Sequence, residues 1–360
     1  MNLRVLFIVP HPIEGPSSRF RVYQFVDYLQ ANGVDATVRP FLSSQLTSVI
    51  YRPGARAAKV QATLWGAACR VADIGAAFRY DVVYVLREAF PFGPPWVEHA
   101  LRRATGKLIF DFDDAIYMPS LAYHNPLDRF RDFGKPRKLI TMASRVVVGS
   151  EHLRDYALRF ARSPRHVAVV PTVVDTTVYC PRPVRKASPT VTVGWIGTPR
   201  GSSYLLDLLD PIRVLSTEFP QLAFSFVGAE PFATQGLPIT FKPWRLDDEV
   251  ADLQSFDIGI MPLTDDEETR GKCGFKLIQY MGVGIPVVCS PVGANRSIVE
   301  AGLSGYFATT PDEWLASLRL LIGDADTRLR LGQRGREIAT ARYSRQAVAP
   351  RLLAILREAA

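Results

Sequence analysis

The feature of the sequence that most constrains its fold is a pattern that occurs twice: an apolar strand, a turn rich in Gly, Pro and Ser, and then an amphipathic helix. The first copy runs from the strand Leu3–Val9 through HPIEGPSS into a helix predicted from about Arg19 to Leu29. The second runs from the strand Thr190–Ile196 through GTPRGSS into a helix predicted from about Tyr204. Strands that alternate with helices are typical of right-handed β-α-β units and parallel sheets. The sequence therefore predicts an α/β protein with two Rossmann-like domains that face a central cleft.

Further short apolar runs are predicted to be strands. Most are continuously apolar, which is typical of strands covered by helices on both faces. They are Val34–Val38, Asp81–Leu86, Lys107–Phe112, Arg145–Val148, Val167–Val170, Ala223–Val227, Ile258–Met261 and Pro286–Cys289. The stretch 179–189, rich in Pro and charge and without periodicity, is interpreted as a linker between an N-terminal domain, 1–178, and a C-terminal domain, 190–344. A C-terminal helix is expected within 345–360, and the sequence leaves open on which of the two domains it packs.

Composition excludes several classes of protein. The 43 Lys and Arg residues against 35 Asp and Glu give a net charge of +8, which favours anionic partners. The four cysteines lie far apart without a C-x-x-C pair, which argues against a zinc cluster or a disulfide scaffold. No signal peptide, spanning segment or basic-aromatic RNA platform is recognised, so we predict a cytoplasmic protein with no nucleic-acid partner.

The segment RGKCGFKLIQYMGVGIPVVCSPVG, residues 270–293, carries the strongest site signal. Backbone amides near Gly274 and Phe275 would point out of the N-terminus of a short helix, while Lys272 and Lys276 add positive charge for a phosphate. Lys276 and Gln279 are three residues apart and therefore share a helical face. The residues expected at a diphosphate are Lys272, Cys273, Gly274, Phe275, Lys276 and Gln279. The alternative is an ordinary helix–strand unit with exposed lysines.

A second candidate is GWIGTPRGSS, residues 194–203, which follows a strand and precedes a helix. It supplies flexible backbone and one cation at a place suited to a diphosphate. Its glycine spacing matches neither G-x-G-x-x-G nor a P-loop, so a plain loop is the alternative. The residues expected to bind are Gly197, Thr198 and Arg200.

Two candidates lie in the N-terminal half. Ser17 and Ser18 are predicted to cap the first helix, which places Arg19 and Arg21 in its first turn. The helix dipole disfavours cations there by roughly 0.3–1 kcal/mol each, and a bound phosphate or carboxylate would reverse this. The alternative is that both arginines bend into solvent.

The other N-terminal candidate is the acidic group Asp111, Asp113 and Asp114, which ends a strand. Alternation places Asp111 and Asp113 on one face, with Asp114 already in the turn. Such a group can bind Mg²⁺ or Mn²⁺, or accept hydrogen bonds from sugar hydroxyls, and a purely structural role is the alternative.

Six segments occur in an order that resembles the GT-B glycosyltransferases of the retaining family 4 group, glycosyl transferases group 1. They are ASRVVVGSEHLRDYA, VVPTVVDTTVYCP, VGWIGT, FSFVGAEP, QYMGVGIPVVCSPVG and SIVEAGLSGYFATTPDEW. The likeness covers nearly the whole chain. It implies a UDP-sugar or GDP-sugar donor held by the C-terminal domain, an acceptor held by the N-terminal domain, and no obligatory metal or other cofactor. The group's Glu-x7-Glu pair falls on Gly271 and Gln279, and its His-Asp falls on Asp113 and Asp114.

The resemblance implies a hexosyltransferase-like enzyme that moves a sugar to a saccharide or lipid-linked acceptor in surface polysaccharide or glycolipid biosynthesis. A retaining mechanism of this kind needs no strong protein nucleophile, because the leaving diphosphate can accept the acceptor's proton while fixed charge stabilises it. The expected catalytic residues are Arg200, Lys276 and Asp113; those expected at an acceptor or phosphate are Ser18, Arg19, Arg21 and Asp114. Gln279 would position the ribose, and no residue is assigned to a metal.

Alternatives from other classes stay open. One is a non-catalytic nucleotide- or sugar-binding protein, since the Glu pair is missing, and another is a GT-B epimerase or phosphorylase. The segment 51–80 mixes Arg and Lys with Leu64, Trp65 and Val71 at helical spacing. It is expected either to lie on an anionic membrane, on the inner face of the plasma membrane, or to pack on its own domain.

Overall fold

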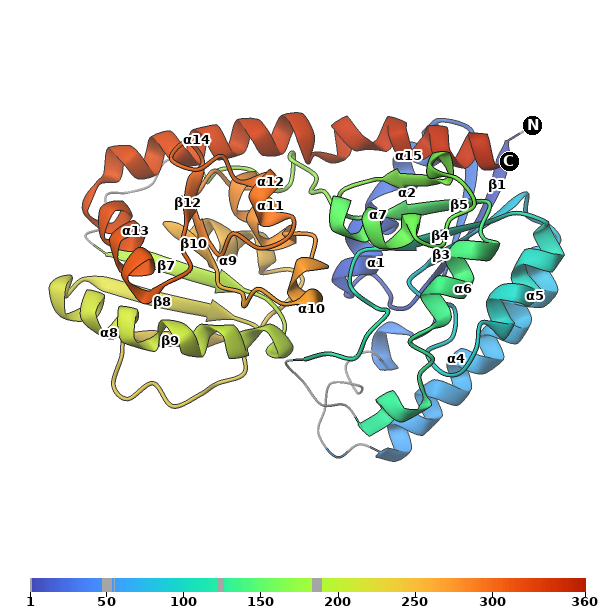
Figure 1. Ribbon diagram of the computed structural model, residues 1–360, viewed down its shortest axis with the longest axis horizontal. Coiled ribbons are helices and arrows are strands. Elements are labelled where there is room, and N and C mark those ends of the chain that lie inside the picture. Colours follow the sequence, from blue (N-terminus) through green and yellow to red (C-terminus); the bar gives the residue numbers. More distant parts are fainter. Residues whose placement is uncertain (1, 47–53, 55, 122–125, 183–189) are drawn as a thin grey trace. The chain divides into compact units, whose positions relative to one another are not determined.

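The computed structural model describes residues 2–46, 54, 56–121, 126–182 and 190–360, and the chain forms two compact units (Figure 1). Unit 1 comprises Met1–Ser120, His124–Val173 and Val348–Ala360, and unit 2 comprises Leu121–Tyr123 and Val174–Ala347. Most of the predicted linker, residues 183–189, lies outside the described residues. No helix in the described part of the chain is long and apolar enough to cross a membrane.

Unit 1 contains a parallel sheet of six strands in the order β2-β1-β3-β4-β5-β6. The strands are β1 (Leu3–Val9), β2 (Val34–Pro40), β3 (Val82–Leu86), β4 (Leu108–Phe112), β5 (Arg145–Val148) and β6 (Val167–Val169). The helices are α1 (Pro16–Arg21), α2 (Val26–Ala31), α4 (Arg56–Ala77), α5 (Trp96–Thr105), α6 (Lys135–Met142) and α7 (Glu151–Leu158). Short 3₁₀ turns are η1 (Tyr23–Phe25), η2 (Pro126–Phe130) and η3 (Pro164–His166).

The two faces of this sheet are covered by different helices. Right-handed crossovers place α4, α5, α6 and α7 on one face and α1 and α2 on the other. The last helix, α15 (Arg345–Ala359), adds Leu352 and Leu356 to the same apolar core as Leu29 of α2 and Phe7 of β1. Unit 1 is thus completed by the end of the chain.

Unit 2 contains a second parallel sheet of six strands, in the order β12-β11-β10-β7-β8-β9. The strands are β7 (Val191–Ile196), β8 (Leu222–Val227), β9 (Ile239–Lys242), β10 (Ile258–Met261), β11 (Val287–Cys289) and β12 (Gly305–Phe307). The helices are η4 (Pro199–Leu208), α8 (Leu209–Glu218), α9 (Glu249–Ser255), α10 (Glu267–Arg270), α11 (Phe275–Gly282), α12 (Asn295–Ile298), α13 (Pro311–Gly323) and α14 (Ala325–Arg342). The predicted α/β class with two parallel Rossmann-like sheets is confirmed.

The first predicted helix is wrong in its boundaries. It starts at Pro16 with Gly15 as the N-cap, so Ser17 and Ser18 lie inside it and do not cap it. It is interrupted at Val22, whose φ of −130° is not helical, and continues as η1 and α2. The second predicted helix is preceded by the 3₁₀ segment η4, and α8 starts only at Leu209.

Candidate active site

Two glycines bring strand ends of unit 2 close together. Gly197 follows β7 and donates its N–H to the carbonyl of Val227, at 3.0 Å, and Gly228 follows β8. A Cβ on Gly228 would lie 2.1 Å from the carbonyl oxygen of Gly197, and the φ of Gly228 is +74°. Only glycine fits there without strain, so open backbone lies at the carboxyl ends of these strands, where α/β proteins bind ligands.

Lys276 of α11 lies against this backbone. Its Nζ is 5.1 Å from the centroid of the buried Trp195 ring, and a Cβ on Gly197 would lie 2.8 Å from its Cε. The aromatic ring holds the ammonium group by a cation–π contact. The structure therefore brings together Gly197 and Lys276, two residues predicted from separate segments.

The other residues predicted for the diphosphate belong to the segments that begin η4 and α11. Thr198 and Arg200 are exposed in and before η4. Gly274, with a φ of +63°, precedes α11, and a Cβ there would lie 2.3 Å from the side chain of Ile298. Lys272, which lies just after α10, is 4.0 Å from Glu268, and Cys273 is buried. All of the predicted donor residues thus belong to unit 2.

A buried polar network around Glu249 was not predicted. Its carboxylate accepts hydrogen bonds from Trp244 Nε1 at 2.7 Å, from Gln279 Nε2 at 3.1 Å and from the hydroxyl of Tyr179. Glu249 and Gln279 are 3% and 4% exposed. Because its amide nitrogen binds Glu249, Gln279 keeps its carbonyl oxygen as an acceptor, and no described residue donates to that oxygen.

In unit 1, the buried side chain of Arg21 binds groups of the sheet and of the segment after it. Its guanidinium makes a two-pronged ion pair with Asp111 and donates to the carbonyl of Val170. The hydroxyl of Tyr84 donates to the same carboxylate at 2.7 Å. Burial acts to lower the pKa of Arg21, but Asp111 outweighs it and raises this pKa, so the guanidinium stays charged. Asp111, and not a bound anion or solvent, therefore compensates Arg21, which corrects the expectation from the helix dipole.

Asp113 and Asp114 are paired with Arg87, a residue that sequence reasoning missed. Arg87 Nε lies 2.6 Å from Asp113, and Arg87 Nη2 lies 3.5 Å from Asp114. Ser17 also donates to Asp113, at 2.7 Å. Burial acts to raise the pKa of Asp113, but Arg87 and Ser17 outweigh it and lower this pKa below the usual range. Arg87 has a φ of +61°, a conformation that is rare outside glycine and that marks a constrained loop after β3.

The remaining predicted residues lie near these pairs. Ser18 is buried and accepts a hydrogen bond from the backbone of His11 at 3.2 Å. Arg19 donates to the carbonyl of Ile13 and lies 4.4 Å from the centroid of the Phe20 ring. Among the described residues, no group of three or more His, Cys, Asp or Glu side chains is arranged to hold a metal ion. Asp113 and Asp114 each face Arg87 instead.

Comparison with protein families and curated proteins points to one class of enzyme. The family described as "Glycosyl transferases group 1" matches residues 190–324, which lie in unit 2. The MMP alpha-(1->4)-mannosyltransferase of Mycolicibacterium hassiacum is 30% identical over 227 residues, which cover 59% of this chain and 54% of that protein. The chain thus matches about half the length of this relative.

Solved structures resemble the whole chain in fold. Anabaena Alr3699/HepE, in complex with UDP-glucose, has a TM-score of 0.72 at 15% identity and covers 99% of this chain and 100% of its own. Sucrose-phosphate synthase of Thermosynechococcus elongatus has a TM-score of 0.70 at 15% identity, with 99% of both chains covered. The two units have the GT-B fold, and the matches support the predicted enzyme class, a glycosyltransferase.

Proposed function

We propose that the protein is a retaining glycosyltransferase of family 4 that moves a sugar from a nucleoside diphosphate to a saccharide or lipid-linked acceptor. One observation carries the proposal: the glycosyl transferases group 1 match, residues 190–324, contains the place where Lys276 lies against the open backbone of Gly197. The donor is a UDP-sugar or a GDP-sugar. The complex of Alr3699/HepE with UDP-glucose supports a nucleotide-sugar donor, and the name of the mannosyltransferase supports the transfer of a hexose.

Unit 2 supplies the groups for the donor. The exposed Arg200 and the restrained Lys276 bind the diphosphate, together with Thr198, Lys272 and the backbone of 273–275. The carbonyl oxygen of Gln279, oriented by Glu249, accepts a hydrogen bond from a ribose hydroxyl. The Gln279 carbonyl oxygen is thus a hydrogen-bond acceptor at the position where the family's Glu-x7-Glu pattern has its second Glu.

The donor's own leaving group serves as the base in the transfer. The bond between the anomeric carbon and the diphosphate oxygen breaks, and the acceptor oxygen bonds to the same face of that carbon. The acceptor's proton moves to the departing diphosphate, which removes the need for a protein base. Arg200 and Lys276 stabilise the charge that develops on the leaving group, an effect worth about 10²–10³ in rate for one well-placed group.

Unit 1 supplies the groups for the sugars. Asp113 and Asp114, held by Arg87, accept hydrogen bonds from sugar hydroxyls, and Ser18 and Arg19 shape the neighbouring loop. Arg21 acts indirectly, because it holds Asp111 in the sheet. We place the reaction in surface polysaccharide or glycolipid assembly, with the protein attached to the inner face of the plasma membrane; its net charge of +8 supports such an attachment.

The test is a thermal-shift panel with UDP, GDP, ADP, TDP and CMP, each with and without Mg²⁺, followed by assay of nucleotide release. A ligand at about 100 times its Kd stabilises the folded state by about 2.7 kcal/mol. We expect one diphosphate to stabilise the protein without metal and its sugar to be transferred. Tight binding without turnover would favour a non-catalytic binding protein. This is the main alternative to the proposed function, because Gly271 stands at the position of the family's first Glu. Turnover without an acceptor would favour an epimerase or phosphorylase.

A further inference from the structure

One long helix of unit 1 exposes an apolar stripe. Small or polar side chains of α4 face the unit, including Ala62, Gly66 and Ala77. The opposite face and the residue after the helix carry large apolar side chains that are 56–70% exposed: Val60, Leu64, Trp65, Val71 and Phe78. Single exposed apolar residues are normal, but a row of them along one helix marks an interaction surface.

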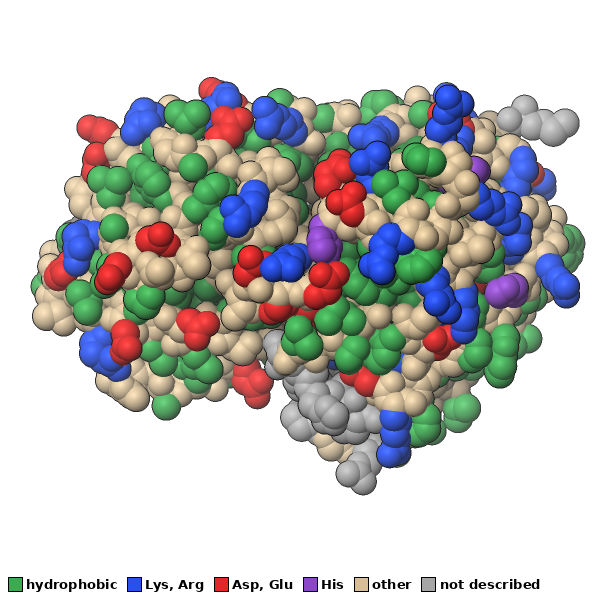
Figure 2. Space-filling model, viewed as in Figure 1, with side chains coloured by type: hydrophobic (Ala, Val, Ile, Leu, Met, Phe, Trp, Pro, Cys, Tyr) green, Lys and Arg blue, Asp and Glu red, His purple; other side chains and the backbone are tan. Residues whose placement is uncertain are grey.

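The exposed charges carried by α4, α5 and α6 themselves have one sign. On α4, α5 and α6 the only carboxylates are Asp73 and Glu98, and both are buried. Asp73 pairs with the buried Arg70 at 2.7 Å, and Glu98 accepts a backbone N–H at 2.9 Å. The described charged side chains that reach solvent from these helices are all cationic: Lys59, Arg102, Arg103, Arg137 and Lys138. Figure 2 shows Lys and Arg side chains beside hydrophobic ones over α5 and α6.

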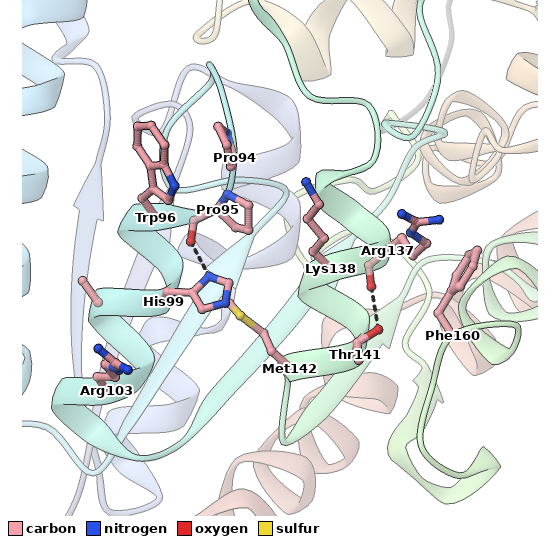
Figure 3. Close-up of a pocket in the computed structure, with 11 residues that line it drawn as sticks. Pro94, Pro95, Trp96, His99, Arg103, Arg137, Lys138, Thr141, Met142 and Phe160 are labelled. Atoms are coloured by element: carbon pink, nitrogen blue, oxygen red, sulfur yellow. Dashed lines mark hydrogen bonds between the residues drawn. The ribbon is translucent and has the colours of Figure 1, made fainter.

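A groove of about 890 Å³ runs between α5 and α6 (Figure 3). Helix α5 packs along α4. The walls of the groove carry Trp96, His99, Arg103, Arg137, Lys138 and Phe160, and no acidic residue lines it. Lys138 pairs with Asp132 at 2.7 Å, whereas Arg103 and Arg137 have no acidic partner among the described residues. In Figure 3 Arg103 lies on α5, whereas Lys138 and Arg137 lie on α6, with Arg137 on the side of α6 that faces Phe160.

We propose that this face of unit 1, defined by α4, α5 and α6, docks on an anionic phospholipid bilayer, and that lipid phosphates enter the groove between α5 and α6. The stripe on α4 enters the boundary between headgroups and acyl chains, as amphipathic surface helices do. The cations contact phosphate, and the exposed Trp65 and Trp96 suit the interfacial region. A purely apolar partner would leave Arg103 and Arg137 uncompensated, whereas an anionic bilayer satisfies both the stripe and the cations. The inference rests on the proposed function in its lipid-linked form.

The experiment is co-sedimentation of the full chain with vesicles of phosphatidylcholine, with and without phosphatidylglycerol, at low and high salt. We expect binding only to the anionic vesicles and only at low salt. The double variant Arg103→Gln/Arg137→Gln should bind roughly 30-fold more weakly, because each cation near an anionic surface contributes about 1 kcal/mol. Leu64→Ser/Val71→Ser should also lose binding, since it removes the apolar stripe. The control, Arg213→Gln/Arg319→Gln, removes two exposed cations of unit 2 and should bind like the wild type.

Three outcomes would overturn the proposal: no vesicle binding by the wild type, equal binding by the groove variant, or a concentration-dependent dimer that Leu64→Ser/Val71→Ser dissociates. Hydrogen exchange of β1 is measured on every variant and should be unchanged, which shows that unit 1 is folded in each. Vesicle binding without sugar transfer would contradict the proposed function alone. Transfer to a water-soluble acceptor without vesicle binding would contradict the docking surface alone.

Discussion

At the scale of single residues, the cations of unit 2 differ in their surroundings. Lys276 is restrained by Trp195, whereas Arg200 is exposed on η4. An exposed side chain contributes little to folding, so its effect on the reaction can be separated from its effect on stability.

Arg200→Ala should lower kcat about 10²–10³-fold, because a charge aimed at the leaving diphosphate is lost. The free energy of unfolding should change by less than about 0.5 kcal/mol. Steady-state kinetics and urea unfolding measure the two effects. Arg213→Ala, an exposed arginine that pairs with Asp210 on α8, is the matched control and should alter neither. Equal losses of rate and stability at Arg200 would remove its assigned role.

Glu249→Gln should disturb both folding and nucleotide binding. The new amide offers a donor where three donors already converge, which leaves a buried hydrogen bond unmade at a cost of about 1–3 kcal/mol. It also releases Gln279 from its orientation, so we expect the Kd for the nucleotide to rise about tenfold. Urea unfolding and nucleotide titration test this, with the exposed Glu218→Gln as control. An unchanged Kd in a destabilised variant would limit Glu249 to a structural role.

His11 should make unit 1 sensitive to acid. Burial, with the nearby charge of Arg87, lowers its pKa to about 4. Between this value and about pH 6.5 the unfolded chain binds one more proton than the folded chain, so stability is lost as the pH falls through this window, by on the order of 3 kcal/mol in all. His11→Asn should lose less stability than the wild type between pH 7 and about pH 5 in urea unfolding. The exposed His99→Asn should behave like the wild type.

The predictable part of the site consists of residues in recognisable local segments. Gly197 and Lys276 belong to loop–helix motifs, and such motifs can be recognised from the sequence as candidate phosphate-binding segments. Glu249 and Trp244 were missed because their significance arises only from a buried network across loop and helix, with no local pattern. Arg21 was misinterpreted because its partner, Asp111, lies 90 positions away in the chain.

At the scale of elements, strands were easier to predict than helix boundaries. Long apolar runs such as β1 and β4 are buried on both sheet faces and stand out in the sequence. The edge strands β9 and β12 are short and half-buried, so their residues resemble a loop. The break between α1 and α2 has a tertiary cause, since Arg21 and Gln24 bind the carbonyls of Val170 and Val173.

The packing of α14 on the turn that follows α11 depends on one close approach. A Cβ on Gly332 would lie 2.2 Å from the carbonyl oxygen of Gly284, and backbone cannot move aside cheaply. A Cβ on Gly335 would lie 3.1 Å from the flexible side chain of Met281 and 3.7 Å from its Cα, which is an ordinary van der Waals contact. Gly332→Ala should therefore destabilise unit 2 by about 1–3 kcal/mol, while Gly335→Ala should stay within about 1 kcal/mol of the wild type. Thermal unfolding compares them, and equal effects would contradict this packing.

At the scale of the whole molecule, unit 1 depends on the final helix. A chain ended after Ala347 would lose Val348, Leu352, Leu353, Ile355 and Leu356 from its core. Burial of each such side chain contributes about 1.5–3 kcal/mol, and the sum is comparable to the entire stability of a domain. Hydrogen exchange should show β1 unprotected and β7 protected. Arg357→Ala, which removes only a hydrogen bond to the carbonyl of Asn32, is the control and should keep β1 protected.

The discontinuous composition of unit 1 has a consequence for synthesis on the ribosome. All of unit 2 up to Ala347 is translated before Val348–Ala360, the segment that closes the core of unit 1. At about 5–20 residues per second, the intervening chain takes roughly 10–35 s to emerge. The N-terminal part of unit 1 therefore keeps part of its apolar core exposed while unit 2 is translated and folds. The order of maturation is the reverse of the order of translation, and a nascent chain stalled before Val348 is the form that chaperones would have to hold.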